Sequence, residues 1–271
     1  MMLDREGPVL ADYVAVADGV QLFCRHAGSR TTARPPMIFL HGNRDNHSHY
    51  ADLQEQLGAD QYTVAVDFRG HGLSSTLDVP LSAALFADDI ERLILHYEWD
   101  KVVLAGHSLG SAVAITLADR RPDLVDRLVL MGSAASFSLP FQRPEHPPTK
   151  ETWSEYVREA NARALPFFFH DKHPDVARRV SAAWSVIAFE VHQNLVRMRH
   201  PGLEETIRRL TVPALVVAGA QDKCTTVEQA EWIQGNHRDA RLSVIPETAH
   251  FMYMERPELV AEAIRAFLLG R

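Results

Sequence analysis

The chain has 271 residues, 46% of them hydrophobic, which is enough for one large core with room for an inserted subdomain. Its formal net charge is −7 and it contains no basic cluster, so nucleic acid and anionic membrane surfaces are disfavoured as partners. Cys24 and Cys224 are its only cysteines and lack zinc-binding spacing, so we predict neither a disulfide framework nor a structural metal.

The sequence also carries information on localisation. Its first residues include Asp4, Arg5 and Glu6 and no apolar segment typical of a signal peptide. No apolar run in the chain approaches the roughly 18 residues that a membrane-spanning helix needs. Because the cysteine usage fits a reducing compartment, we expect a cytoplasmic protein that interacts with no membrane.

Strand-like and helix-like segments alternate along most of the chain. Residues 12–16 and 21–26 predict an antiparallel hairpin, because Asp18-Gly19 between them favours a two-residue turn. Six further strands are predicted at residues 36–40, 62–66, 102–105, 125–131, 214–217 and 242–245. Helices are predicted at residues 50–57, 85–97, 108–120, 226–233 and 257–268. This order predicts a mostly parallel, eight-stranded α/β sheet flanked by helices, with ligands beyond the carboxyl ends of the strands.

The alternation stops between residues 134 and 210, where prolines separate segments of helical period. We interpret this region as a helical insertion. The expected domains are therefore an α/β core formed by residues 1–133 and 211–271, and a helical cap formed by residues 134–210.

A Gly-x-Ser-x-Gly motif, Gly106-His107-Ser108-Leu109-Gly110, follows the predicted strand 102–105 and opens the helix after it. A serine at a sharp strand-to-helix turn has strained backbone angles, and the flanking glycines let strand and helix approach closely. We interpret the motif as a nucleophile elbow. The N–H of Leu109, at the start of a helix, would then stabilise a developing oxyanion.

A serine hydroxyl needs a base within hydrogen-bond reach, and histidine titrates in the right range. Among the 14 histidines, His250 lies in a loop that follows a strand near the C-terminus. His41 and His71 lie in glycine-rich turns and His107 lies inside the elbow, where imidazoles more often hold loop backbone. His250 is therefore the candidate base.

The motifs together resemble those of α/β-hydrolase-fold proteins of the serine-nucleophile branch. The resemblance covers the chain from Tyr13 to the C-terminus, apart from the insertion. The residues that carry it are His41-Gly42-Asn43, residues 67–72, residues 106–110, Asp222 and His250. It implies an α/β-hydrolase fold with an inserted helical cap, and an esterase-like, thioesterase-like or lactonase-like activity that needs no metal or organic cofactor.

The resemblance also implies residue roles. The order in this branch is serine, acid, histidine, so Ser108 is the expected nucleophile, Asp222 the residue that orients the base, and His250 the base. The loop after the third strand supplies the second oxyanion donor, which is the N–H of Asn43 beside that of Leu109.

Two related chemistries are disfavoured. Asn43 and Arg44 replace the aromatic-proline pair of the cofactor-free haloperoxidases and perhydrolases. The His-Gly-Asn start is also similar to that of haloalkane dehalogenases, but those enzymes and the epoxide hydrolases use an aspartate nucleophile where this chain has Ser108.

Aromatic residues of the insertion indicate the substrate pocket. No single helix face can bury the whole run Leu165-Pro166-Phe167-Phe168-Phe169-His170, which favours a hydrophobic acyl or aryl site. The residues expected to bind substrate are Phe167, Phe168, Phe169, Trp184 and Phe251. Packing of cap against core, or a dimer surface, is the alternative for this run, and monomer and homodimer both stay open.

We therefore predict a serine hydrolase that cleaves an ester-type bond of a small, largely apolar substrate through an acyl-enzyme. The bond is a carboxylic ester, a thioester or a lactone, and a thioester would make an acyl carrier or coenzyme A the partner. A carbon–carbon bond hydrolase of the same fold is one alternative. A ligand-binding protein or receptor without turnover is another.

Overall fold

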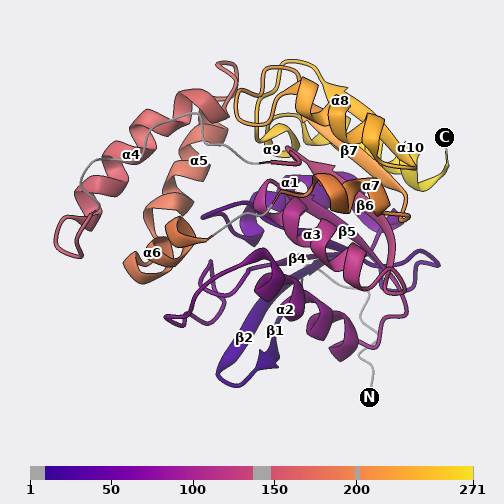
Figure 1. The fold of residues 1–271 in the computed structure, drawn as a ribbon, viewed down its shortest axis with the longest axis horizontal. Helices are drawn as coiled ribbons and strands as arrows, with labels where there is room; N and C mark the ends of the chain where they lie inside the picture. The colour runs from indigo at the N-terminus through magenta and orange to yellow at the C-terminus, as the bar shows by residue number, and fades with distance from the viewer. Residues whose placement is uncertain (1–9, 137–147, 199–201, 271) are drawn as a thin grey trace.

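The computed structural model describes residues 10–136, 148–198 and 202–270, and it confirms an eight-stranded, mostly parallel sheet flanked by helices (Figure 1). The strands are β1 (Leu10–Ala17), β2 (Val20–Ala27), β3 (Met37–Leu40), β4 (Thr63–Val66), β5 (Val102–His107), β6 (Val125–Met131), β7 (Ala214–Gly219) and β8 (Ala240–Ile245). Their order in the sheet is β1-β2-β4-β3-β5-β6-β7-β8. Only the pairings of β2 with β1 and with β4 are antiparallel.

Helices cover both faces of this sheet. They are η1 (His47–Tyr50), α1 (Ala51–Leu57), η2 (Gly58–Asp60), α2 (Ala83–His96), α3 (Leu109–Arg120), α7 (Glu204–Arg209), α8 (Val227–Asn236), α9 (Met252–Glu255) and α10 (Pro257–Leu268). The central strands are buried on both faces because alternate residues point to opposite sides. In β3, Ile38 and Leu40 pack in the core with α2 and α3, whereas Met37 and Phe39 pack in the core with α1 and α10.

Three helices stand apart from the sheet on the left of Figure 1: α4 (Trp153–Phe168), α5 (Pro174–Ser185) and α6 (Phe189–Arg197). We call them the α4–α6 segment. The predicted insertion, residues 134–210, also includes α7, whose Ile207 is fully buried in the core that contains α3 and α8. The division of the chain into a core and an inserted cap stays a prediction.

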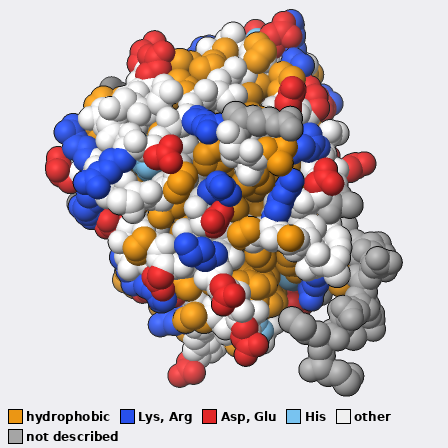
Figure 2. All heavy atoms as spheres, turned by 90° about the vertical axis from the view of Figure 1, so that its right-hand side faces the viewer, with side chains coloured by type: hydrophobic (Ala, Val, Ile, Leu, Met, Phe, Trp, Pro, Cys, Tyr) orange, Lys and Arg blue, Asp and Glu red, His pale blue; other side chains and the backbone are white. Residues whose placement is uncertain are grey.

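The surface and the helices bear on the expected partners. On the face shown in Figure 2, basic and acidic side chains are interspersed rather than gathered into a field of one sign. Within residues 10–136, 148–198 and 202–270, no helix combines the length and the apolar character needed to cross a bilayer.

Candidate active site

Ser108 lies at the sharp turn between β5 and α3. Its backbone angles are φ 51° and ψ −114°, a left-handed conformation that is strained for any residue with a side chain. A Cβ atom on Gly106 would lie 2.3 Å from the carbonyl oxygen of Gly110, and one on Gly110 would lie 2.0 Å from that of Leu40. The turn therefore requires glycine at both positions.

Asn43 and Leu109 follow neighbouring strands of the sheet, and Leu109 is the residue after Ser108. Leu40 of β3 is in register with Gly106 of β5, so the loops that hold Asn43 and Leu109 leave neighbouring strands three residues further on. Within the described part of the chain, neither the N–H of Asn43 nor that of Leu109 has a hydrogen-bond acceptor. Such unpaired donors at the start of a helix and in an adjacent loop suit a developing oxyanion.

Asp222 and His250 come together from the loops after β7 and β8. His250 Nδ1–H donates to Asp222 Oδ2 at 2.8 Å, and both side chains are buried. The hydroxyl of Thr225 donates to the same Oδ2 at 2.7 Å, and its oxygen lies 3.2 Å from His250 Nδ1. The other carboxylate oxygen, Oδ1, accepts the backbone N–H groups of Cys224 at 2.7 Å and Thr225 at 3.0 Å.

These contacts set the charge state of the pair. Burial alone would raise the pKa of the Asp222 carboxyl, but the charge and hydrogen bond of His250 and the hydrogen bonds from Thr225 lower this pKa below its usual value. A carboxylate that accepts Nδ1–H leaves Nε2 of His250 as the unprotonated nitrogen. Nε2 is therefore the atom of His250 that can take a proton.

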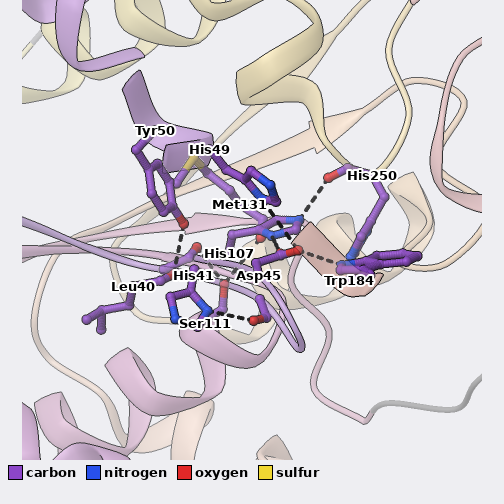
Figure 3. Close-up of polar contacts among 12 residues, drawn as sticks. Leu40, His41, Asp45, His49, Tyr50, His107, Ser111, Met131, Trp184 and His250 are labelled. Carbon is purple, nitrogen blue, oxygen red and sulfur yellow. Dashed lines mark hydrogen bonds and ion pairs between the residues drawn. The ribbon is translucent and has the colours of Figure 1, made fainter. Parts of the chain in front are cut away.

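In the part of the chain that the structure describes, the Ser108 hydroxyl makes no hydrogen bond to His250. Catalytic hydrogen bonds of this kind are often long before substrate binds and shorten in the complex. The two residues are connected through His107, the last residue of β5. His107 donates its Nε2–H to the carbonyl oxygen of His250 at 2.9 Å, and the two imidazole rings lie 4.6 Å apart (Figure 3).

His41, His71 and His107 form hydrogen bonds to backbone groups, as we expected. His41 Nε2 accepts the N–H of Phe68 at 3.0 Å, so its proton is on Nδ1, which donates to a carbonyl at 2.7 Å. His71 Nδ1 bonds the carbonyl of Arg69 at 3.1 Å. Burial lowers the pKa of His41 to about 3, and it also lowers the pKa values of His71 and His107.

Asp45, which the sequence analysis did not single out, lies buried beneath this site (Figure 3). Its Oδ1 accepts the indole N–H of Trp184 at 2.7 Å and lies 3.5 Å from His49 Nδ1, and its Oδ2 lies 3.7 Å from His107 Nδ1. Burial would raise the pKa of Asp45, but His107 and His49 lower it overall. Asp45 thus joins the α4–α6 segment to the residue next to Ser108.

Glu255 of α9 is a second residue that sequence reasoning missed. Its two carboxylate oxygens accept the backbone N–H groups of His170 at 2.7 Å and Ala249 at 2.6 Å. The N–H of His250 also donates to the carbonyl of Phe168 at 3.0 Å. Burial raises the pKa of Glu255. The loop that carries His250 is therefore bonded directly to the end of α4.

Four of the five aromatic residues predicted to bind substrate are buried around His250. The Phe168 ring lies 5.3 Å from the His250 ring and 5.4 Å from that of Trp184. Phe251 lies 5.6 Å from His250 and stacks on Phe169 at 4.9 Å. Phe167 is only partly buried against the same core. Their role in substrate binding stays a prediction.

No group of three or more histidine, cysteine, aspartate or glutamate side chains is arranged to hold a metal ion in the part of the chain that the structure describes.

Comparison with known proteins places this site in a family. Residues 35–257 match the family described as alpha/beta hydrolase fold. The chain belongs to the alpha/beta hydrolase fold family.

The relatives are hydrolases of similar length. The chain is 27% identical over 257 residues to 2-(acetamidomethylene)succinate hydrolase of Mesorhizobium japonicum, covering 86% of this chain and 88% of that protein. It is 23% identical to 3-oxoadipate enol-lactonase 2 of Acinetobacter baylyi, covering 87% and 89%. The solved enol-lactonase of Burkholderia xenovorans superposes with a TM-score of 0.82 at 21% identity, covering 95% and 100%, which shows a shared fold. Family and relatives together support a hydrolase activity.

Proposed function

We propose that this protein is a serine hydrolase that cleaves an ester-type bond of a small molecule. The observation that carries the proposal is the Asp222–His250 pair, joined at 2.8 Å, beside a strained Ser108 turn. The unpaired N–H groups of Asn43 and Leu109 supply the oxyanion donors that acyl transfer requires.

In the mechanism that we propose, His250 Nε2 takes the proton of the Ser108 hydroxyl while Oγ attacks the substrate carbonyl carbon. The carbonyl oxygen gains the negative charge and accepts the N–H groups of Asn43 and Leu109. Asp222 stabilises the imidazolium that has formed. His250 then protonates the leaving oxygen as its bond to carbon breaks, which leaves an acyl-enzyme on Ser108.

Water completes the cycle by the same route. His250 Nε2 takes a proton from the water molecule as its oxygen attacks the acyl carbonyl, and the proton passes to Ser108 Oγ as the acyl bond breaks. Phe168 packs against His250 from the α4–α6 segment, Trp184 packs against Phe168, and the two rings would exclude bulk water from this step. We propose that this segment acts as a cap over the substrate.

The names of the relatives favour a small substrate. One relative is a lactonase, and another is a hydrolase of an acetamidomethylene derivative of succinate. We therefore propose a lactone or a carboxylic ester as the bond, in preference to a thioester on a carrier protein.

The test is hydrolysis of p-nitrophenyl esters from acetate to decanoate and of simple lactones, with wild type, Ser108→Ala and Ser48→Ala compared. Ser48 is an exposed serine of η1 and serves as the matched control. Turnover and fluorophosphonate labelling should disappear in Ser108→Ala and persist in Ser48→Ala. Substantial residual activity in Ser108→Ala would contradict the proposal, and labelling of wild type without any turnover would favour the receptor alternative.

A further inference from the structure

Arg44 follows the proposed oxyanion residue Asn43 directly. Its backbone has φ 63°, a left-handed conformation that is uncommon for a residue with a long side chain. Consecutive Cα atoms are about 3.8 Å apart, so the guanidinium lies within one side chain's length of the oxyanion donors. The loop therefore holds the Cα atom of Arg44 beside the proposed oxyanion residue.

The guanidinium has few partners. It lies over the indole ring of Trp184 at 4.4 Å and donates one hydrogen bond, at 3.3 Å, to the amide oxygen of Asn161. Across the described ranges, no carboxylate oxygen lies within 4.0 Å of it. An arginine has five N–H donors, so most of the hydrogen-bonding capacity of Arg44 is unused.

No neighbouring charge in the described part of the chain makes an ion pair with Arg44. The carboxylate of Asp45 is engaged by the Trp184 indole N–H and faces His49 and His107. On the side of the α4–α6 segment, burial and the charge of Arg44 lower the pKa of His192 to about 4, so that imidazole is neutral at pH 7. The guanidinium is thus a partly buried cation that stacks on an aromatic ring and makes no ion pair with a described residue. Burial lowers the pKa of Arg44 overall, although the charge of Asp45 acts against this effect. A cation in such a place is costly unless a ligand completes it.

The same aromatic side chains connect this cation to the proposed catalytic base. The Arg44 guanidinium lies over the ring of Trp184. The centre of the Trp184 ring is 5.4 Å from that of Phe168, and the Phe168 ring centre is 5.3 Å from that of His250. A substrate bound between the oxyanion donors and these rings would extend toward Arg44.

We propose that Arg44 binds a carboxylate of the substrate, so that the ester or lactone cleaved at Ser108 carries an acidic group. The proposal rests on the proposed function and narrows its substrate class. Guanidinium and carboxylate match as a planar, two-hydrogen-bond pair, and the charge-assisted bonds would be strong in this partly desolvated place.

A matched pair of substrates tests this. Mono-p-nitrophenyl glutarate and p-nitrophenyl valerate have acyl chains of equal length, and a carboxylate in the first replaces a methyl group in the second. Wild type should prefer the glutarate at least tenfold in kcat/KM. Arg44→Met should lower this preference at least tenfold, mainly through KM of the glutarate, and Arg44→Lys should recover part of it because the charge remains.

Arg179→Met is the control for a merely structural role. Arg179 also connects the α4–α6 segment to the core, through a 2.6 Å hydrogen bond from α5 to Asp52 of α1, but it is exposed and remote in sequence. It should keep the wild-type preference. Equal loss on both substrates in Arg44→Met, or no preference in wild type, would overturn the proposal.

A binding measurement separates this proposal from the proposed function. Calorimetric titration of glutarate into Ser108→Ala protein requires no turnover. Affinity should fall at least tenfold when Arg44→Met is added to Ser108→Ala, and equal affinities would refute the carboxylate subsite. If wild type hydrolyses no ester but glutarate binding depends on Arg44, the hydrolase proposal fails and the subsite stands.

Discussion

Replacing Asp222 by asparagine should invert the proton arrangement on His250. Asp222 Oδ1 accepts two backbone N–H groups, those of Cys224 and Thr225, so only the amide oxygen of an asparagine can occupy that position. The amide NH2 group must then occupy the Oδ2 position, 2.8 Å from His250 Nδ1. Turning the amide over would leave two backbone donors facing an NH2 group, at a cost of about 1–3 kcal/mol for each.

An NH2 group at that position can only donate, so Nδ1 must become the acceptor and the proton must move to Nε2. The hydroxyl of Thr225 can rotate to accept the second amide hydrogen, which makes the inverted arrangement stable. A base with its proton on the reacting nitrogen is the wrong tautomer. The loss seen for this change in a serine protease is about 10⁴-fold in kcat, or about 5.5 kcal/mol in activation free energy, and we expect a similar loss here.

The assay is the rate of fluorophosphonate labelling, with kcat for a p-nitrophenyl ester as the second measurement. Asp239→Asn, at an exposed position before β8, is the matched control and should keep the wild-type rate. A folded Asp222→Asn protein with a labelling rate within tenfold of wild type would refute the role of Asp222 and the tautomer argument together.

Two further changes probe the same site. Gly132 has φ 52°, and a Cβ atom there would lie 3.1 Å from two atoms of the His250 ring. Because this contact would displace the base, Gly132→Ala should reduce the rate of fluorophosphonate labelling by about 10–100-fold. An unchanged labelling rate would contradict this reasoning. The folded-state pKa of His41 is about 3, below its unfolded value of about 6.5, so the folded state binds fewer protons and stability falls as pH falls from about 6.5 toward 3. Urea unfolding should show a slope smaller by up to about 1.4 kcal/mol per pH unit in His41→Gln over this window, and equal slopes would be evidence against a neutral buried His41.

The sequence predicted the features that depend on short stretches of chain. The predicted strand at residues 125–131 and helix at residues 257–268 coincide with β6 and α10. Strand alternation also predicted that the functional loops lie beyond the carboxyl ends of the strands, because parallel strands end at the same edge. The role of the elbow glycines could be predicted because the close approach of strand and helix that requires them involves only neighbouring residues.

Contacts between distant residues escaped prediction. Asp45 and Trp184 are 139 positions apart, and His170 and Glu255 are 85 positions apart, so no local pattern pairs them. The sequence analysis singled out Arg44 only as part of the pair that replaces the aromatic-proline motif, and it assigned this residue no binding role. Arg44 makes no ion pair in the described part of the chain because of how the surrounding residues pack, and no sequence pattern indicates this.

The bonds made by Glu255 bear on engineering of this protein. Because the end of α4 is fixed to the loop of His250 by Glu255 and by the Phe168 carbonyl, the α4–α6 segment is not an interchangeable module with free ends. A chimera that takes this segment from a relative would have to bring a matching α9 with it. Changing side chains on α4 and α5 would thus disturb the loop of His250 less than exchanging the helices themselves.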